Sequence, residues 1–397
     1  MRKKKIVVSG TGCCLVDRLY NTVSFHSDVF LSFSSKKRGD GGLSPGHLVL
    51  KEEFETFANK NFPVVLHELT AGKAPDRINV GGPCIVALIH AAQITNGTDC
   101  EIRFYGCHGA DENGNFLLDA LKKLPVNINH YQQIGSLTPS TDVFSDPDYD
   151  KGHGERVFVN SIGAAWDYGP ENLDADFFKS DIVVFGGTAL VPQIHLHLGE
   201  LLQQAKAKGC ITLVNTVFDF VNEKANPQQR WPLGRDDESY PYIDLLITDR
   251  DEALRLSGEL SLDKAIQFFM AKQTGAVMIT NGAENVWICA DSELFGKVDM
   301  KELPVSKSVS HKIRKKLCDG DTTGCGDNFV GGVIGSLIFQ LLAGREKVDM
   351  EEATALGIVS GGYACLYIGG TFFEKYPGEK YERMIPILDD YKKQIHS

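Results

Sequence analysis

The chain has 397 residues, of which 43% are hydrophobic and 23% charged, so it is long enough to bury one large core or two modest ones. The formal net charge of −11 argues against a nucleic-acid-binding protein, because such proteins present a basic face to phosphates. The ten cysteines are scattered without a CxxC pair, which favours reduced thiols in a cytoplasmic protein over a disulfide scaffold or a zinc site.

The first segment, KKIVVSG at residues 4–10, is predicted to be a strand. Basic residues precede its apolar part, as they do in a signal peptide, but the apolar part is short and Asp17 follows soon after it. The longest apolar segment, Phe329–Ala343, falls short of the roughly 20 residues that span a bilayer. We therefore expect a soluble protein without a membrane partner.

Strand-like and helix-like segments then alternate over most of the chain. The expected strands cover 4–10, 100–107, 180–187, 211–219, 242–248 and 276–282, and the expected helices cover 84–94, 114–124, 194–209, 251–258 and 262–275. This alternation predicts a single α/β domain over residues 1–397, with a mainly parallel, doubly wound sheet and helices on both faces.

Two regions interrupt the alternation. Residues 20–76 are polar and glycine-rich around a helix-like stretch at 52–62, and residues 130–167 contain short strands around the turn-rich sequence DPDYDKGHGE. Such segments form either a lid over a binding site or surface decoration, and composition favours neither. The basic run HKIRKK at 311–316 is interpreted as a solvated hairpin face, with electrostatic steering of a nucleotide as the alternative.

The stretch DGDTTGCGDNFVGG, at 319–332, places a glycine-rich turn directly before a helix that looks buried. The backbone N–H groups of Gly324, Cys325 and Gly326 are expected to form an anion hole at the helix start, where the helix dipole adds partial positive charge. Asp327 is either a helix-stabilising carboxylate or a general base beside a phosphate site. Phosphoryl transfer to a hydroxyl group needs such a base.

These residues resemble a known signature. DTTGCGDNFVGG, Asp321–Gly332, is similar to the DTxGAGDxFxGG signature of the PfkB, or ribokinase, family of carbohydrate kinases, with Cys325 in place of the usual alanine. Further segments resemble the family in the expected order, and they begin at Gly81, Phe104, Gly154 and Tyr242. The resemblance covers nearly all of the chain except residues 20–76.

The resemblance implies a ribokinase-like three-layer α/β/α sandwich with a small β lid, which transfers the γ-phosphoryl group of ATP to an alcohol. It implies ATP and Mg²⁺, with a monovalent cation such as K⁺ as a further candidate, and a homodimer that pairs through the lid. The implied roles are Asp327 as catalytic base, Asp17, Gly81 and Gly82 in substrate binding, Thr280, Gly282 and Thr323 in nucleotide binding, and Glu252 with Asp249 in magnesium binding.

Alternatives remain for the acceptor. A sugar is the first hypothesis, a nucleoside the second, and a catalytically silent relative that binds a sugar or nucleotide the third. A nicotinamide-binding Rossmann enzyme is disfavoured, because GTGCCLVD retains only Gly10 and Gly12 of the GxGxxG pattern. His195 and His197 lie two residues apart on an expected helix, so they face different directions and are interpreted as structural.

Overall fold

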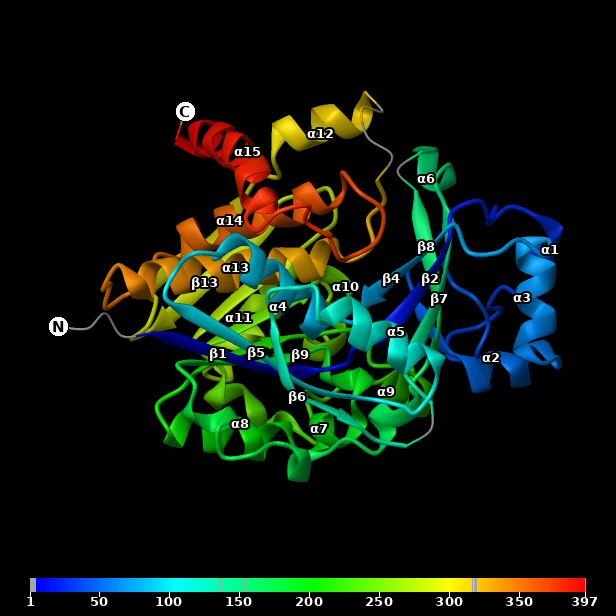
Figure 1. Ribbon diagram of the computed structural model, residues 1–397, viewed down its shortest axis with the longest axis horizontal. Helices are drawn as coiled ribbons and strands as arrows, with labels where there is room; N and C mark the ends of the chain where they lie inside the picture. The colour runs from blue at the N-terminus through cyan, green and yellow to red at the C-terminus, as the bar shows by residue number, and fades with distance from the viewer. Residues whose placement is uncertain (1–4, 136, 153, 316, 318–319, 397) are drawn as a thin grey trace.

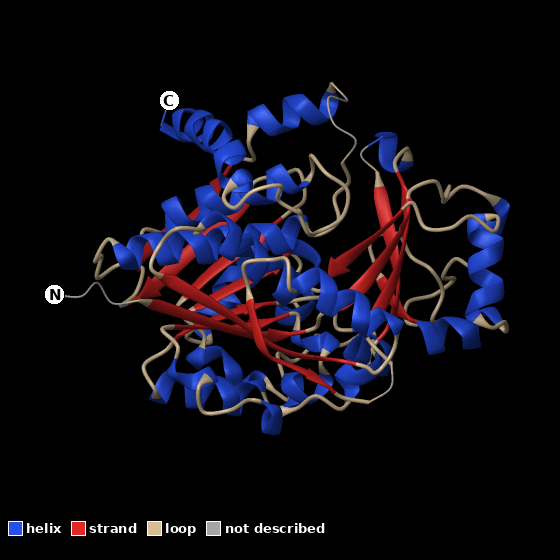
Figure 2. Cartoon of the chain, in the orientation of Figure 1, coloured by secondary structure: helices blue, strands red, loops and turns tan. Residues whose placement is uncertain are grey.

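The computed structural model describes residues 5–135, 137–152, 154–315, 317 and 320–396, and these residues form two β-sheets (Figure 1). The larger sheet has nine strands in the order β14-β13-β12-β11-β10-β9-β1-β5-β6, and the smaller has five in the order β3-β8-β7-β2-β4. Figure 2 shows the smaller sheet standing beside one end of the larger sheet.

The larger sheet is mainly parallel. Its parallel strands are β1 (Ile6–Gly12), β5 (Cys100–His108), β6 (Asn127–Gln133), β9 (Ile182–Gly186), β10 (Ile211–Asn215), β11 (Leu245–Asp249) and β12 (Ala276–Thr280). The antiparallel strands β13 (Val286–Ser292) and β14 (Gly296–Leu303) complete one edge. The central strand β9 is buried along its whole length, as expected for a strand covered on both faces.

Helices cover both faces of this sheet, which confirms the predicted ribokinase-like α/β sandwich. One face carries α4 (Pro83–Ile94), α13 (Cys325–Leu342), α14 (Met350–Ala364) and α15 (Glu379–His396), and the other carries α7 (Pro192–Leu196), α8 (Leu198–Ala207), α10 (Arg250–Ser257) and α11 (Leu262–Ala271) (Figure 1). Each layer has its own apolar cluster against the sheet. The strand order reverses between β1 and β9, and ligands of doubly wound sheets bind beyond the strand ends at such a point.

One helix prediction and one hairpin prediction need correction. The helix expected over 194–209 is two helices, α7 and α8, because the backbone leaves the helical conformation at His197, whose ring nitrogen Nδ1 bonds the Gln193 carbonyl. The predicted hairpin at 311–316 is wrong, because residues 307–314 form the helix α12 (Lys307–Arg314), which Ser306 caps by accepting from Val309 N–H. Sparse apolar residues on one side were enough to hold this helix, with Val309 buried.

Residues 20–76 form a compact helical unit on the outer face of the smaller sheet. The unit contains α1 (Asp28–Ser32), α2 (Lys51–Ala58) and α3 (Phe62–Thr70), and its short strand β3 (Leu48–Leu50) pairs with β8 (Glu155–Ser161). Side chains of the unit pack against side chains of the smaller sheet in one apolar cluster, whose members include Phe30, Phe54, Phe62, Tyr20, Phe144, Val157 and Val159. The unit therefore covers much of the outer face of the smaller sheet, and the other face is left to meet the larger sheet.

Helix α13 is long and apolar enough by length and composition to cross a membrane, but 67% of its 18 residues are buried inside the molecule. It packs between α4 and α14, and its glycines allow close approach of those helices: a Cβ on Gly331 would lie 2.5 Å from the Ala87 carbonyl oxygen. The apolar composition of α13 is therefore that of a core helix. Its first turn lies at the edge of the sheet where ligands of doubly wound sheets bind.

Candidate active site

The glycine-rich turn before α13 takes the conformation that an anion hole needs. Gly324 is the N-cap, with φ +71°, and a Cβ at this position would meet Gly370 at 2.5 Å, so only glycine fits. A Cβ on Gly326 would meet no atom within 4 Å, which leaves open space at the helix start. Cys325 N–H donates weakly back to the Thr322 carbonyl oxygen at 3.3 Å. The N–H groups of Gly326 and Asp327 have no intrahelical acceptor, because they lie in the first turn, and they form the positive end of the helix dipole.

Asp327 lies in the first turn of α13 and is half-buried. Burial raises the pKa of its carboxyl group to about 6, and the positive charge of Arg156 partly opposes this shift. A carboxylate with a pKa near the working pH is suited to general base catalysis. None of the residues that the structure describes donates a hydrogen bond to this carboxylate, which leaves it able to accept one from a substrate.

Asp17, which the family resemblance implies in substrate binding, lies on the smaller sheet. The first strand, β1, ends at Gly12, and Asp17 lies inside β2 (Leu15–Tyr20). The chain crosses between the sheets at Cys13 and Cys14, both buried. Burial raises the pKa of the Asp17 carboxyl group, and repulsion from Asp327 is the next largest cause, so the two carboxylates lie close enough to repel each other.

A row of buried polar side chains crosses the inner face of the smaller sheet. In the strand register Asp17 pairs with Asn79 of β4 (Arg77–Gly81) on one side and with Thr141 of β7 (Ser140–Asp146) on the other, and Thr141 pairs with Asn160 of β8. Directly paired residues point to the same face of a sheet. Asn160 donates to Thr141 Oγ1 at 2.7 Å, and its own Oδ1 has no partner among the described residues. The row therefore offers free acceptors to a polyhydroxylated ligand.

The glycine pair at 81 and 82 closes the end of this row. A Cβ on Gly81 would lie 2.0 Å from Asp17 Oδ2, and one on Gly82, at φ +111°, would lie 2.2 Å from the Cys13 carbonyl oxygen. Larger residues would displace Asp17 or the crossover between the sheets. The pair is thus needed to let Asp17 sit against the backbone of β4.

Arg156 is a site residue that the sequence did not single out. It lies on β8, four residues before Asn160, so the alternation of a strand puts both on the inner face. Its positive charge lowers the pKa of both Asp17 and Asp327, and its Nε has no hydrogen-bond acceptor among the described residues. The alternation of polar and apolar residues in ERVFVNS places Arg156 and Asn160 on one face of a strand. The local sequence does not indicate, however, which face of that strand lies at the site.

Glu252 and Asp249 lie together at the end of β11 and the start of α10. The two residues form a reciprocal cap, in which Asp249 Oδ1 accepts from Glu252 N–H at 2.8 Å and the Glu252 side chain accepts from Asp249 N–H. Glu252 is buried, and its carboxylate also accepts from the hydroxyl groups of Thr216 and Thr248. Burial, then Asp249, then more weakly Asp327 raise the pKa of Glu252. A divalent cation would relieve this crowding of carboxylates, and hard oxygen donors suit Mg²⁺.

No group of three or more histidine, cysteine, aspartate or glutamate side chains that could hold a metal ion occurs among the residues with described positions. A magnesium ion at Glu252 would therefore complete its shell with waters and phosphate oxygens, as is usual for Mg²⁺ in phosphoryl-transfer enzymes. The acidic pair fits such an ion chemically.

The three residues predicted to bind the nucleotide lie at two places. Thr280 ends β12, and Gly282 follows with φ +56° and open space around its Cα, so both lie at the carboxyl edge of the larger sheet. Thr323 is buried, and its N–H and hydroxyl both donate to Asp321. Thr323 thus shapes the turn before α13 in this structure.

A buried tether holds the start of α13 in place, and no pattern in the sequence indicated it. Asn328 donates to the carbonyl oxygens of Gly324 and Gly370 at 2.8 and 2.9 Å, and it accepts at 2.8 Å from the ammonium group of Lys380. Lys380 is 1% exposed, and burial lowers its pKa. The C-terminal helix α15 is thereby tied to the N-cap of the anion hole.

Asn328→Leu should lower the free energy of unfolding by about 1–3 kcal/mol, because it removes the acceptor of the buried Lys380 ammonium group. Urea denaturation of the variant and the wild type measures the difference. Asn115→Leu, on the exposed side of α5 (Glu112–Leu121), is the matched control and should change stability by less than about 0.5 kcal/mol. An unchanged midpoint for Asn328→Leu would show that the tether contributes nothing to stability.

The fold resembles those of several solved kinases. An adenosine kinase from Anopheles gambiae in complex with P1,P4-di(adenosine-5) tetraphosphate is 21% identical, with a TM-score of 0.66 over 90% of this chain and 95% of that one. An adenosine kinase from Schistosoma mansoni in complex with 2-fluoroadenosine is 16% identical, with a TM-score of 0.69 over 94% and 98%. A ribokinase from Thermotoga maritima is 18% identical, with a TM-score of 0.59 over 97% and 99%.

At these identities the likeness shows the fold. The family follows from the sequence model of the pfkB family carbohydrate kinases, which matches residues 79–375 and so includes Asn79, Thr141 and Asn160 of the polar row and the whole of α13. Together with the resemblance of the DTTGCGDNFVGG stretch, this match shows that the chain belongs to the pfkB family of carbohydrate kinases.

Proposed function

We propose that this protein transfers the γ-phosphoryl group of ATP to a hydroxyl group of a sugar or sugar-like substrate. The observation that carries the proposal is the opposition of Asp327, at the anion-binding helix start, to the polar row of Asp17 on the facing sheet. One side offers a base and a phosphate cradle, and the other offers acceptors for hydroxyl groups. Phosphoryl transfer to an alcohol needs both.

In this proposal the acceptor lies on the inner face of the smaller sheet, with adjacent hydroxyl groups donating to the Asp17 carboxylate. Asp327 Oδ accepts the proton of the attacking hydroxyl group while the hydroxyl oxygen bonds the γ-phosphorus, and the bond from the γ-phosphorus to the β–γ bridging oxygen breaks, so that ADP leaves. The N–H groups at the start of α13 donate to the oxygens of the transferred group, and the Arg156 guanidinium approaches the same charge from the opposite sheet. Closing the two sheets over the substrate excludes water, which would otherwise accept the phosphoryl group.

Glu252, with Asp249 behind it, would hold Mg²⁺ and its water shell beside the phosphates. When bound, the ion neutralises charge on the β- and γ-phosphate oxygens. Glu252 is suited to the task because its backbone and side chain are fixed by the reciprocal cap with Asp249.

A nucleoside acceptor is the second candidate. Phe158 lies on the inner face of the smaller sheet between Arg156 and Asn160, and its ring is only partly buried. An aromatic ring beside a row of hydroxyl-binding groups is able to stack on a nucleobase while the ribose meets Asp17.

Coupled measurement of ADP release, with MgATP and a panel of ketoses, aldoses, sugar acids and nucleosides, tests the proposal. Turnover well above the rate with ATP alone is expected for one chemical class. If no compound drives ADP release although some raise the melting temperature, the protein is a silent sugar-binding or nucleotide-binding relative.

The acid side of the pH–rate profile should report Asp327. Because its pKa is raised to about 6, the carboxylate is protonated below that pH, and kcat/KM should fall about tenfold for each further pH unit. Activity should therefore rise through about pH 6 and level off above it. A profile that stays flat down to about pH 5 would contradict a base with a raised pKa.

A further inference from the structure

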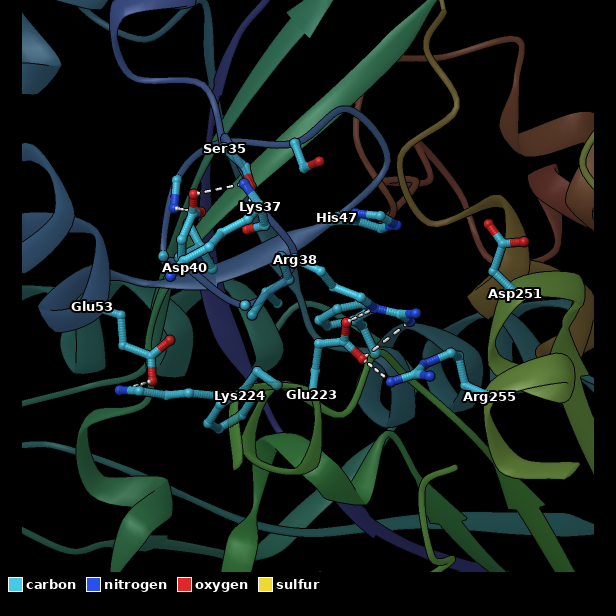
Figure 3. Close-up of a pocket in the computed structure, with 18 of the residues that line it drawn as sticks. Ser35, Lys37, Arg38, Asp40, His47, Glu53, Glu223, Lys224, Asp251 and Arg255 are labelled. Atoms are coloured by element: carbon cyan, nitrogen blue, oxygen red, sulfur yellow. Dashed lines mark hydrogen bonds and ion pairs between the residues drawn. The ribbon is translucent and has the colours of Figure 1, made fainter. Parts of the chain in front are cut away.

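A cavity of about 550 Å³ lies between the helical unit of residues 20–76 and the larger sheet's layer of helices (Figure 3). One wall is formed by residues 35–53, and the other by residues 218–231 and by 251–255 of α10. Asp17, Arg156 and Asp327 are not among its lining residues. The cavity is in the size range of small-molecule sites and is open to one side.

Nine of the 21 lining residues are charged, and basic side chains outnumber acidic ones although the chain as a whole carries −11. Five basic side chains face four acidic ones: Lys36, Lys37, Arg38, Lys224 and Arg255 against Asp40, Glu53, Glu223 and Asp251. An acidic protein that gathers basic groups around one cavity creates a local field that attracts anions.

Each acidic group of the lining already has donors. Glu223 is buried, and it accepts from Arg38, Arg255 and the Trp231 indole (Figure 3). Lys224 Nζ lies 2.7 Å from Glu53 Oε1.

The other two carboxylates are likewise engaged. Asp40 accepts from three backbone N–H groups, those of Lys36, Lys37 and Gly42, at 2.8–3.0 Å. Asp251 Oδ1 lies 2.9 Å from Arg250 Nη1. Each of the four carboxylate groups therefore has a hydrogen-bond donor or a cation beside it within the protein. For this reason the four groups repel a further anion only weakly.

The basic groups are not fully matched. Arg38 and Arg255 share the single negative charge of Glu223, so one positive charge of this cluster is uncompensated. Arg255 is mostly buried, and its Nε has no acceptor within the described part of the chain. Lys36 and Lys37 lie at the rim, and no carboxylate among the described residues pairs with either ammonium group.

An aromatic wall stands beside these cations. The His47 ring stacks on Phe218, with centroids 5.2 Å apart, and the Arg255 guanidinium lies over the Trp231 ring at 5.1 Å. Guanidinium and ammonium groups together match the oxygens of a phosphate, and aromatic rings pack well against the apolar face of a sugar.

We propose that this cavity binds a small phosphomonoester of the size of a hexose phosphate, separately from the phosphoryl-transfer site. The phosphate group lies against Arg38, Arg255, Lys36 and Lys37, and the carbon skeleton lies along His47 and Phe218. The ligand bridges the helical unit of residues 20–76 and α10, the helix that also carries Glu252. The proposal concerns binding alone, so it stands or falls independently of the catalytic function.

Isothermal titration of the full chain with glucose 6-phosphate tests the proposal, with inorganic phosphate and glucose as comparison ligands. The double variant Lys36→Gln/Lys37→Gln removes two exposed charges that take no part in the Glu223 cluster, so it should fold as the wild type does. Its Kd for glucose 6-phosphate should rise at least about tenfold. Lys297→Gln, on the distant edge strand β14, is the control and should bind as the wild type does.

Each outcome decides one part of the proposal. Equal affinity of the double variant and the wild type would overturn it, because phosphate bound only at the start of α13 would not sense these lysines. Inorganic phosphate that binds as tightly as glucose 6-phosphate would overturn the assignment to a phosphomonoester. Arg255→Lys keeps the charge beside Glu223 but loses the planar guanidinium, so weaker binding by this variant with an unchanged melting temperature supports the role of the arginine.

Discussion

Asp327→Asn is expected to lower kcat by about 10²–10⁴, because a positioned general base contributes that much to the rate. The KM for ATP should change little, since the N–H groups at the start of α13 remain in place. Steady-state kinetics with the acceptor found in the substrate panel measure both constants. Near wild-type turnover would show that the proton leaves by another route.

The loss of activity should not come from unfolding. The pKa of Asp327 is raised in the folded protein, so its stabilising contribution is present at low pH and is lost as the pH rises through about 6. At neutral pH the ionised carboxylate therefore opposes folding, and Asp327→Asn should be at least as stable as the wild type. Asp119→Asn, on the exposed side of α5, is a matched control and should leave kcat and stability unchanged.

Arg156→Met should lower kcat by about 10²–10³, the usual effect of losing one group that stabilises transition-state charge. If Arg156 acts on the transition state, kcat and kcat/KM should fall together. A rise in KM alone would instead show that it binds the ground state equally well. Arg77→Met, on the exposed end of β4 in the same sheet, is the control and should retain wild-type kinetics.

The pH–rate profile of Arg156→Met separates an electrostatic role from a structural one. Arg156 lowers the pKa of Asp327, so its removal should raise that pKa and move the acid limb of the profile to higher pH. A variant that is merely misfolded would lose amplitude without a shift of the limb. An unshifted limb in an active, folded variant would contradict the contact between the two charges.

The alternating strands and helices of the larger sheet were predictable because each carries its own periodic signal. The expected strand at 180–187 and the expected helix at 84–94 correspond to β9 and α4, whose residues are nearly all buried. The errors occurred where the signal was weak. The break at His197 arises from one side-chain bond to the backbone, and α12 has few buried residues, so neither has a pattern that distinguishes it from its alternatives.

The residues of the candidate site also fall into two groups, those that the sequence predicted and those that it did not. Gly324, Asp327, Asp249 and Glu252 were predicted, because each belongs to a short run in which neighbouring residues cooperate in one turn or one cap. Arg156, Asn160 and Lys380 were missed. Their roles depend on residues far along the chain: Lys380 is 52 positions from Asn328, and Arg156 on β8 acts on Asp17 of β2 in the same sheet and on Asp327 of α13.

The sequence by itself determined the family and predicted the chemistry at the start of α13, because the expected anion hole and its carboxylate are consecutive residues whose backbone conformation is local. The tertiary structure alone decided what faces that carboxylate. Strand register placed Asp17, Thr141 and Asn160 on one face of the smaller sheet, and packing turned that face towards α13. Packing also brought Arg38 close to Glu223 and Arg255, which lie 185 and 217 positions further along the chain. No local pattern can specify such a contact, because the contact stabilises the protein only when both segments have folded.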